Sequence, residues 1–155
     1  MGSSSGGNNY RHINASRINN GKNLWTNYLD YNFSVSVISN KIQTFNYAHH
    51  YLILRGNDSW FRIAEWAKED GYSGPCHMYA CKKIRYYKCR YLGNYQLRDV
   101  INAINYANKK GDNEYNAVNY NCNHWVENVA SYLGEEITVD RNCSCIEGTR
   151  YVSNK

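Results

Sequence analysis

A single cysteine, Cys122, stands between two asparagines in the stretch YNAVNYNCNHWVENVASYL. The apolar residues that follow it recur at the i, i+3, i+4 spacing of an amphipathic helix, with Asn121 as a natural N-cap and Gly134 as a natural stop. A thiol in the first turn of a helix lies beside unpaired N–H groups and the positive end of the helix dipole, which favour the thiolate. Cys122 is therefore a candidate nucleophile. The alternative is a small core residue on the apolar face of that helix.

A nucleophilic cysteine needs a base, and the sequence offers several histidines. His124 is only two residues on, about 200° around the helix, so it points away from Cys122. His49 and His50 open a predicted strand at 46–56, in which successive side chains alternate between faces, so only one of them is expected to point at the Cys122 helix. The face of His50 also carries Leu52 and Leu54, and the face of His49 carries Tyr51, Ile53 and Arg55. For either histidine, the alternative is a half-buried residue bonded to backbone.

The elements that position these residues follow from hydrophobic periodicity. The patterns predict strands at 32–39, 46–56, 59–66, 79–92 and 136–140, and helices at 96–110 and from Cys122 to Gly134. The second and third strands form a hairpin across a Gly-Asn-Asp turn, and residues 11–31 are ambiguous. Because strands precede helices, the expected fold class is α+β.

The segments HYLILRGND and, about 70 residues later, NCNHW together resemble the H-box and NC motif of the lecithin:retinol acyltransferase-like family. The resemblance covers residues 46 to 133, and the NC motif with its helix is the most specific part. It implies a permuted papain-like (NlpC-type) architecture, with an antiparallel sheet of four to five strands packed with two or three helices. The family includes cellular phospholipid and retinol acyltransferases and the 2A proteins of several picornaviruses. The chain is also similar, more distantly, to the PPPDE deubiquitinase-like peptidases.

Carried over by position, the resemblance makes Cys122 the nucleophile, His50 the base and His124 the structural histidine of the NC motif. The cellular acyltransferases carry a second, orienting histidine on the next strand, but here 59–66 contains none. Glu65 is the only acidic side chain on that strand, and a carboxylate can hold an imidazole in one tautomer, so Glu65 is the expected orienting group. The alternative for Glu65 is a solvated strand charge. The C-terminal membrane helix of the cellular enzymes is also missing.

Two functions from different classes are compatible with these residues. The favoured expectation is a picornavirus 2A-type non-structural protein that binds host factors or RNA and keeps only a vestigial or weak thiol site. The alternative is an active Cys/His acyltransferase or hydrolase acting on phospholipid acyl groups, and an isopeptidase is a third and weaker reading. None of these requires a cofactor.

The net charge of +5 suits an anionic partner such as RNA or a phospholipid surface. The segment KKIRYYKCRY at 82–91 interleaves basic and aromatic side chains, which can hold phosphates and stack the bases of single-stranded RNA. The candidate RNA-binding residues are Lys82, Lys83, Arg85, Tyr87 and Lys88. A strand with one solvated face is the competing interpretation.

Length and cysteine usage bound the remaining possibilities. A chain of 155 residues fits one domain, expected at 11–155 after a flexible leader at 1–10. Because the sequence has no secretory signal, the six cysteines are expected to be reduced thiols. The expected location is the cytoplasm, which for a viral protein is that of the host cell, and the nucleus is a further possible location. The cysteines lack paired CxxC spacing, so no metal site is expected. No membrane span is expected, and a homodimer is left open.

Overall fold

The structure, a computed structural model, describes residues 23–42, 47–68, 74–139 and 150–153 and is of the α+β class, as the sequence predicts. The elements in chain order are α1 (Asn23–Thr26), β1 (Asn32–Ile42), β2 (Tyr47–Arg55), β3 (Phe61–Trp66), β4 (Cys76–Cys81), β5 (Lys83–Gln96), α2 (Leu97–Lys110), α3 (Cys122–Tyr132) and β6 (Arg150–Ser153). The predicted leader at 1–10 lies outside the described residues.

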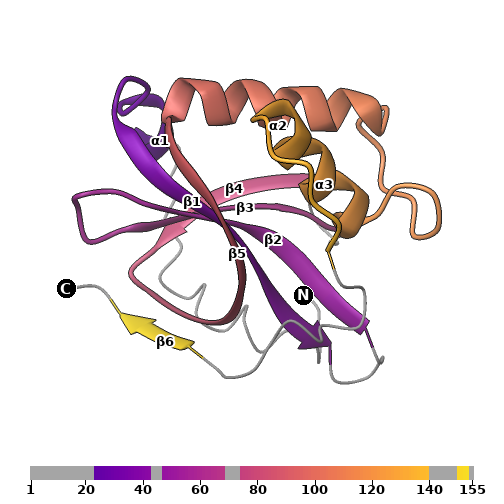
Figure 1. Cartoon of the computed structure of the whole chain (residues 1–155), viewed down its shortest axis with the longest axis horizontal. Coiled ribbons are helices and arrows are strands. Elements are labelled where there is room, and N and C mark those ends of the chain that lie inside the picture. Colours follow the sequence, from indigo (N-terminus) through magenta and orange to yellow (C-terminus); the bar gives the residue numbers. More distant parts are fainter. Residues whose placement is uncertain (1–22, 43–46, 69–73, 140–149, 154–155) are drawn as a thin grey trace.

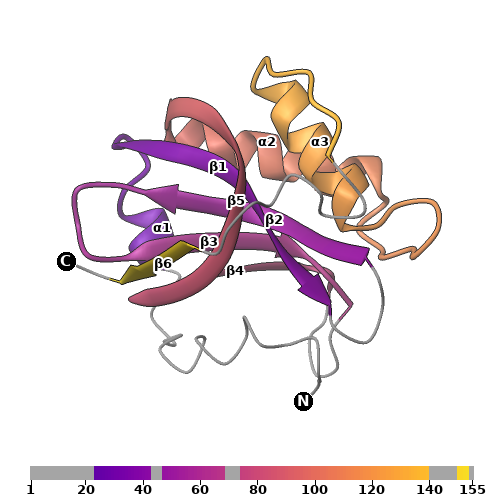
Figure 2. The ribbon, with the colours of Figure 1, turned by 60° about the horizontal axis from the view of Figure 1, so that its bottom comes forward.

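The strands form an antiparallel sheet in the order β4-β3-β2-β1-β5-β6. Helices α2 and α3 pack against each other and lie together on one side of this sheet (Figure 1). β5 is long and strongly bent (Figure 2), and its register with β1 shifts twice, as β-bulges produce. The sheet therefore has one face covered by the two long helices.

Each face of the sheet carries its own apolar cluster, because side chains alternate along a strand. The cluster under the helices joins strand residues such as Leu52, Leu54 and Trp66 to Trp125 and Val129 of α3. The cluster on the opposite face contains Ile38, Tyr51, Ile53, Phe61, Ile63, Tyr79, Cys81 and Ile84. The predicted alternation along β2 is thus confirmed on both faces.

Two predicted strands differ from the structure. The single strand predicted at 79–92 is two strands, β4 and β5, separated by a bend at Lys82. The sequence pattern marks no break there, but β4 pairs with β3 whereas β5 pairs with β1 and β6. The strand predicted at 136–140 is wrong for its described part, because the Val139 N–H donates to Glu127 of α3 and Val139 packs in the helix-side core.

The pairing between β2 and β3 stops before either strand ends. The last paired residues are Leu52 and Ala64, although β2 begins at Tyr47 and β3 runs on to Trp66. Beyond this point β3 pairs only with β4, as far as Trp66 opposite Cys76. The two strands therefore part at the end of the sheet where α3 contacts them both.

Candidate functional site

The N-terminus of α3 is fixed by a reciprocal capping box. The Asn121 side chain accepts hydrogen bonds from the N–H groups of Asn123 (2.9 Å) and His124 (3.4 Å). In return, His124 Nδ1 accepts from the Asn121 N–H at 3.0 Å. His124 is thereby engaged in capping, in agreement with the expectation that it faces away from the thiol and has a structural role.

Cys122, the first residue of α3, is 2% exposed and stands at one end of a row of buried polar groups. Cys122 lies close enough to His49 for the charge and hydrogen bonding of the thiol to raise the pKa of the imidazole, and His49 Nε2 is hydrogen-bonded to Glu65 Oε1 at 2.8 Å. The other carboxylate oxygen of Glu65 accepts from the Tyr79 hydroxyl at 2.9 Å. His49, Glu65 and Tyr79 therefore form one connected chain of hydrogen bonds across β2, β3 and β4, and Cys122 of α3 stands at the His49 end of this chain.

The charge state of His49 is controlled by this chain. Burial acts to lower the pKa of His49, because a buried imidazolium loses its hydration. Cys122 and Glu65 act in the opposite direction through their charge and their hydrogen bonds, and together they raise the pKa of His49 from 6.5 to about 9. At neutral pH His49 is therefore protonated, and its cation is stabilised on one side by the sulfur and on the other by the carboxylate.

His50, the predicted base, has a different partner. Its Nδ1 hydrogen-bonds to Asn123 Oδ1 at 2.7 Å, and the Cys122 thiol donates a long hydrogen bond of 3.8 Å to the same oxygen. His50 therefore contacts the N-terminal turn of α3, as expected, but through Asn123. The histidine whose pKa Cys122 raises is His49, which lies beyond the point where β2 and β3 stop pairing.

Glu65 is fully buried, so the alternative of a solvated strand charge does not describe it. Its Oε1 is hydrogen-bonded to His49 Nε2, whereas the sequence predicted His50 as its partner. The register of the β2–β3 hairpin explains this pairing, because Ile53 lies opposite Ile63 and the two side chains share one face of the sheet. Glu65, two residues after Ile63, therefore lies on the same face as His49 and Tyr51. The site residues that sequence reasoning did not select are His49, Asn123 and Tyr79, and this register was the signal for His49.

The backbone N–H of Cys122 is a further element of the site. The first-turn N–H groups of Asn123 and His124 are taken by the N-cap, and the Trp125 N–H donates to the Asn121 carbonyl. The N–H of Cys122 itself has no hydrogen-bond partner among the residues that the structure describes. An unpaired N–H on the nucleophile's own residue is suited to bind the oxygen of a carbonyl under attack.

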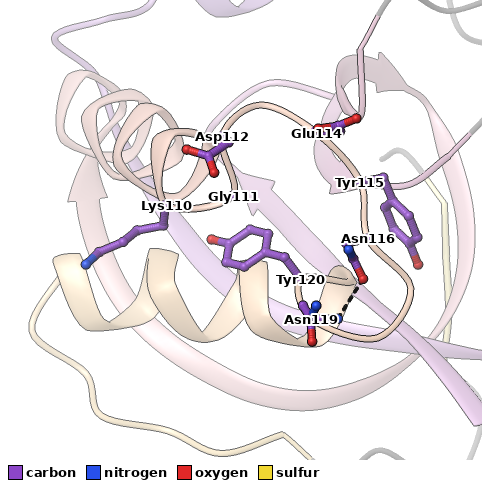
Figure 3. Close-up of a pocket in the computed structure, with 8 residues that line it drawn as sticks. All are labelled: Lys110, Gly111, Asp112, Glu114, Tyr115, Asn116, Asn119 and Tyr120. Carbon is purple, nitrogen blue, oxygen red and sulfur yellow. Dashed lines mark hydrogen bonds between the residues drawn. The ribbon is translucent and has the colours of Figure 1, made fainter.

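A cavity of about 410 Å³ lies in the loop between α2 and α3 (Figure 3). It is lined by Lys110, Gly111, Asp112, Glu114, Tyr115, Asn116, Asn119 and Tyr120. Asn116 shapes the loop by accepting hydrogen bonds from the N–H groups of Val118 and Asn119. Because none of the lining residues is Cys122, His49 or Glu65, this cavity is separate from the thiol chemistry, and we assign it no role.

The predicted RNA-binding residues lie at the start of β5 and just before it. Lys82 and Lys83 are exposed, and the Lys82 ammonium lies 4.9 Å from the centre of the Trp60 ring. Arg85, Tyr87 and Lys88 belong to β5, but their side chains lie outside the described residues. RNA binding by this segment remains a prediction.

The described residues contain neither a cluster of metal ligands nor a helix that could span a membrane. No group of three or more His, Cys, Asp or Glu side chains in this part of the chain is placed to hold a metal ion. No helix within the same residues has the length and apolar character needed to cross a membrane.

Comparison of the chain with protein-family models, with curated proteins and with solved structures finds no match.

Proposed function

We propose that this chain is a cysteine-dependent acyl-transfer or hydrolytic domain of the H-box/NC type, with Cys122 as nucleophile, His49 as base and Glu65 as the group that orients His49. The observation that carries the proposal is that Cys122 stands beside His49, whose imidazole is in turn hydrogen-bonded to the buried Glu65. A nucleophile, a base in contact with it and a third group orienting that base are the parts that thiol catalysis requires. A permuted papain-like architecture is part of the same proposal.

The geometry supports a two-step reaction. His49 Nε2 donates to Glu65, which leaves Nδ1 for the thiol, and with its pKa raised to about 9 His49 holds the thiol's proton at neutral pH. The Cys122 sulfur then attacks a carbonyl carbon, the new C–S bond forms, and the carbonyl electron pair moves onto oxygen beside the Cys122 N–H. When this intermediate collapses, the bond to the leaving group breaks and His49 returns its proton to the departing oxygen or nitrogen. Water or another acceptor next attacks the thioester with His49 again as base, which releases the product and restores the thiol.

In this proposal Glu65 replaces the orienting histidine that the cellular acyltransferases carry. Its two oxygens are held by His49 and by Tyr79, so the carboxylate has a fixed direction. The absence of that histidine was the reason to expect a vestigial site from the sequence, and the Glu65 contacts remove that reason. We therefore favour the active enzyme over the inert one.

One observation favours the second candidate, a picornavirus 2A-type protein that keeps the fold and acts by binding. Cys122 is 2% exposed, and a buried thiol in an apolar helix face is often inert. In that case the partner is RNA or a host protein, and the exposed Lys82 and Lys83 are part of the contact surface.

Alkylation by iodoacetamide across a pH series separates the two candidates. For the enzyme, Cys122 reacts rapidly near neutral pH, His49→Ala slows it by roughly tenfold or more, and His50→Ala has the smaller effect. Cys76 and Cys81 are internal controls, because burial raises the pKa of Cys76 to about 11 and Cys81 is fully buried. A Cys122 that reacts no faster than these two, and equally in the His49 variant, would establish the binding protein instead.

A further inference from the structure

Asn123, the second residue of α3, is a buried amide in contact with the nucleophile. It is 3% exposed, and its Oδ1 accepts hydrogen bonds from His50 Nδ1 at 2.7 Å and from the Cys122 thiol at 3.8 Å. The mechanism proposed above uses neither Asn123 nor His50. A buried polar pair beside a reactive sulfur therefore lacks a role.

The amide nitrogen of Asn123 makes no hydrogen bond to any residue that the structure describes. Within the described part of the chain, the hydrogen bonds of Asn123 are made by its backbone N–H and by Oδ1, and none is made by Nδ2. Nδ2 is not among the fully buried side-chain atoms that lack a partner in the described residues, so it keeps some exposure and is available to a ligand. Nδ2 is bonded to the same carbon as Oδ1 and thus lies in the surroundings of the Cys122 sulfur, where the N–H of Cys122 is also unpaired.

We propose, on the basis of the function proposed above, that Asn123 Nδ2 and the Cys122 N–H together bind the carbonyl oxygen of the acyl substrate, and that His50 is the positioning residue that orients the Asn123 amide. The hydrogen bond that His50 Nδ1 donates to Asn123 Oδ1 turns the amide oxygen toward the histidine and the NH₂ group away from it. The opposite orientation would present an oxygen to the substrate's oxyanion and would repel it.

This arrangement gives the two adjacent histidines separate tasks. His49 carries the proton from sulfur to the leaving group, whereas His50 moves no proton and acts only through Asn123. As the C–S bond forms, the negative charge that develops on the carbonyl oxygen is stabilised by two N–H donors, which keep their protons throughout. The substrate class is accordingly an ester, thioester or amide with an accessible carbonyl.

Two probes of Cys122 distinguish this role from a structural one. Iodoacetamide is attacked at a saturated carbon with loss of iodide, so no oxyanion forms and only the thiolate matters. Acetylation by p-nitrophenyl acetate passes through an oxyanion. Both rates are measured on Cys122 by mass spectrometry in the full chain, with thermal unfolding to verify that each variant is folded. Asn57→Leu, an exposed amide in the β2–β3 turn, is the matched control.

We expect Asn123→Leu to slow acetylation by roughly 100-fold while alkylation stays within about threefold of the wild type. His50→Ala should lower the maximal acetylation rate by roughly tenfold without changing the half-saturating ester concentration. The double variant should be acetylated no more slowly than Asn123→Leu alone. His50→Gln, which restores an N–H donor, should recover most of the loss.

Three results would overturn the proposal. These are acetylation of Asn123→Leu within threefold of the wild type, equal slowing of both probes, or additive losses in the double variant. Failure of the proposed function has a different signature. In that case the His49→Ala variant would be alkylated and acetylated at the same rates as the wild type.

Discussion

His49 and His50 are neighbours in β2, yet they belong to different parts of the molecule. His49 lies on the face of Tyr51 and Ile53, with a carboxylate on one side and a thiol on the other. His50 lies on the helix-covered face and bonds to a neutral amide. The comparison shows that the side-chain environment, and not the residue type or its distance along the chain, assigns a histidine to proton transfer or to positioning.

The difference is electrostatic in origin. Two buried groups that can bear negative charge flank His49, so a proton on its ring is stabilised. His50 is also buried, and its hydrogen-bond partner Asn123 is a neutral amide. The strongest tests of the site are those that treat the two histidines differently.

The largest expected effect is on acyl transfer. We expect His49→Gln to lower the rate of Cys122 acetylation by roughly 10²- to 10⁴-fold, because the general base is lost. His50→Ala should cost only the roughly tenfold expected of a positioning residue, in the same mass-spectrometric assay. A His50 variant that loses more activity than the His49 variant would reverse the assignment and restore His50 as the base.

The next effect concerns stability as a function of pH. The pKa of His49 is raised from 6.5 in the unfolded chain to about 9 in the folded one, so the folded state binds this proton more tightly. The resulting stabilisation, up to about 3 kcal/mol, is fully present below pH 6.5 and is lost as the pH rises to about 9. Urea unfolding of wild type and His49→Gln should show a difference that shrinks over this window. A difference between wild type and His49→Gln that is independent of pH would contradict the prediction.

A smaller effect is expected from Glu65→Gln, which keeps the shape of the side chain and removes its charge. Because Glu65 raises the pKa of His49, the variant should titrate His49 at a lower pH by NMR. We expect acetylation to fall by roughly tenfold, the equivalent of about one pKa unit. In a His49→Gln background the Glu65 substitution should change acetylation little, and a full additional loss there would mean that Glu65 acts by another route.

The smallest effect is expected at the segment 82–91, most of which belongs to β5, a strand separated from β2 by β1. Replacing Lys82, Lys83, Arg85 and Lys88 together should weaken binding to single-stranded RNA and reduce the slope of log affinity against log salt by up to about 3. Cys122 alkylation should be unaffected. Substitution of the exposed Lys109 and Lys110 of α2 is the control for net charge. An equal change in both variants would leave the segment with a solubility role.

The sequence carried more information about the histidines than its motifs suggest. Spacing after the histidine pointed to His50, and alternation placed His50 with Leu52 and Leu54 under the helices, which the structure confirms. The hairpin turn, however, also sets the register that puts Glu65 on the face of His49. A carboxylate chosen to orient the base and a base chosen on the other face of the strand were therefore inconsistent from the beginning.

Local sequence determined the parts of this protein that depend on near neighbours. Asn121 and the apolar periodicity after it specify α3 and the place of Cys122 in its first turn, and alternation specifies the two faces of β2. Only the tertiary structure decided which histidine meets the thiol. That choice depends on where β2 and β3 stop pairing and on how far α3 reaches between them, and both are set by packing among strands and helices distant in the chain. No periodicity in the sequence records the end of a strand pair, because the side chains continue to alternate past it.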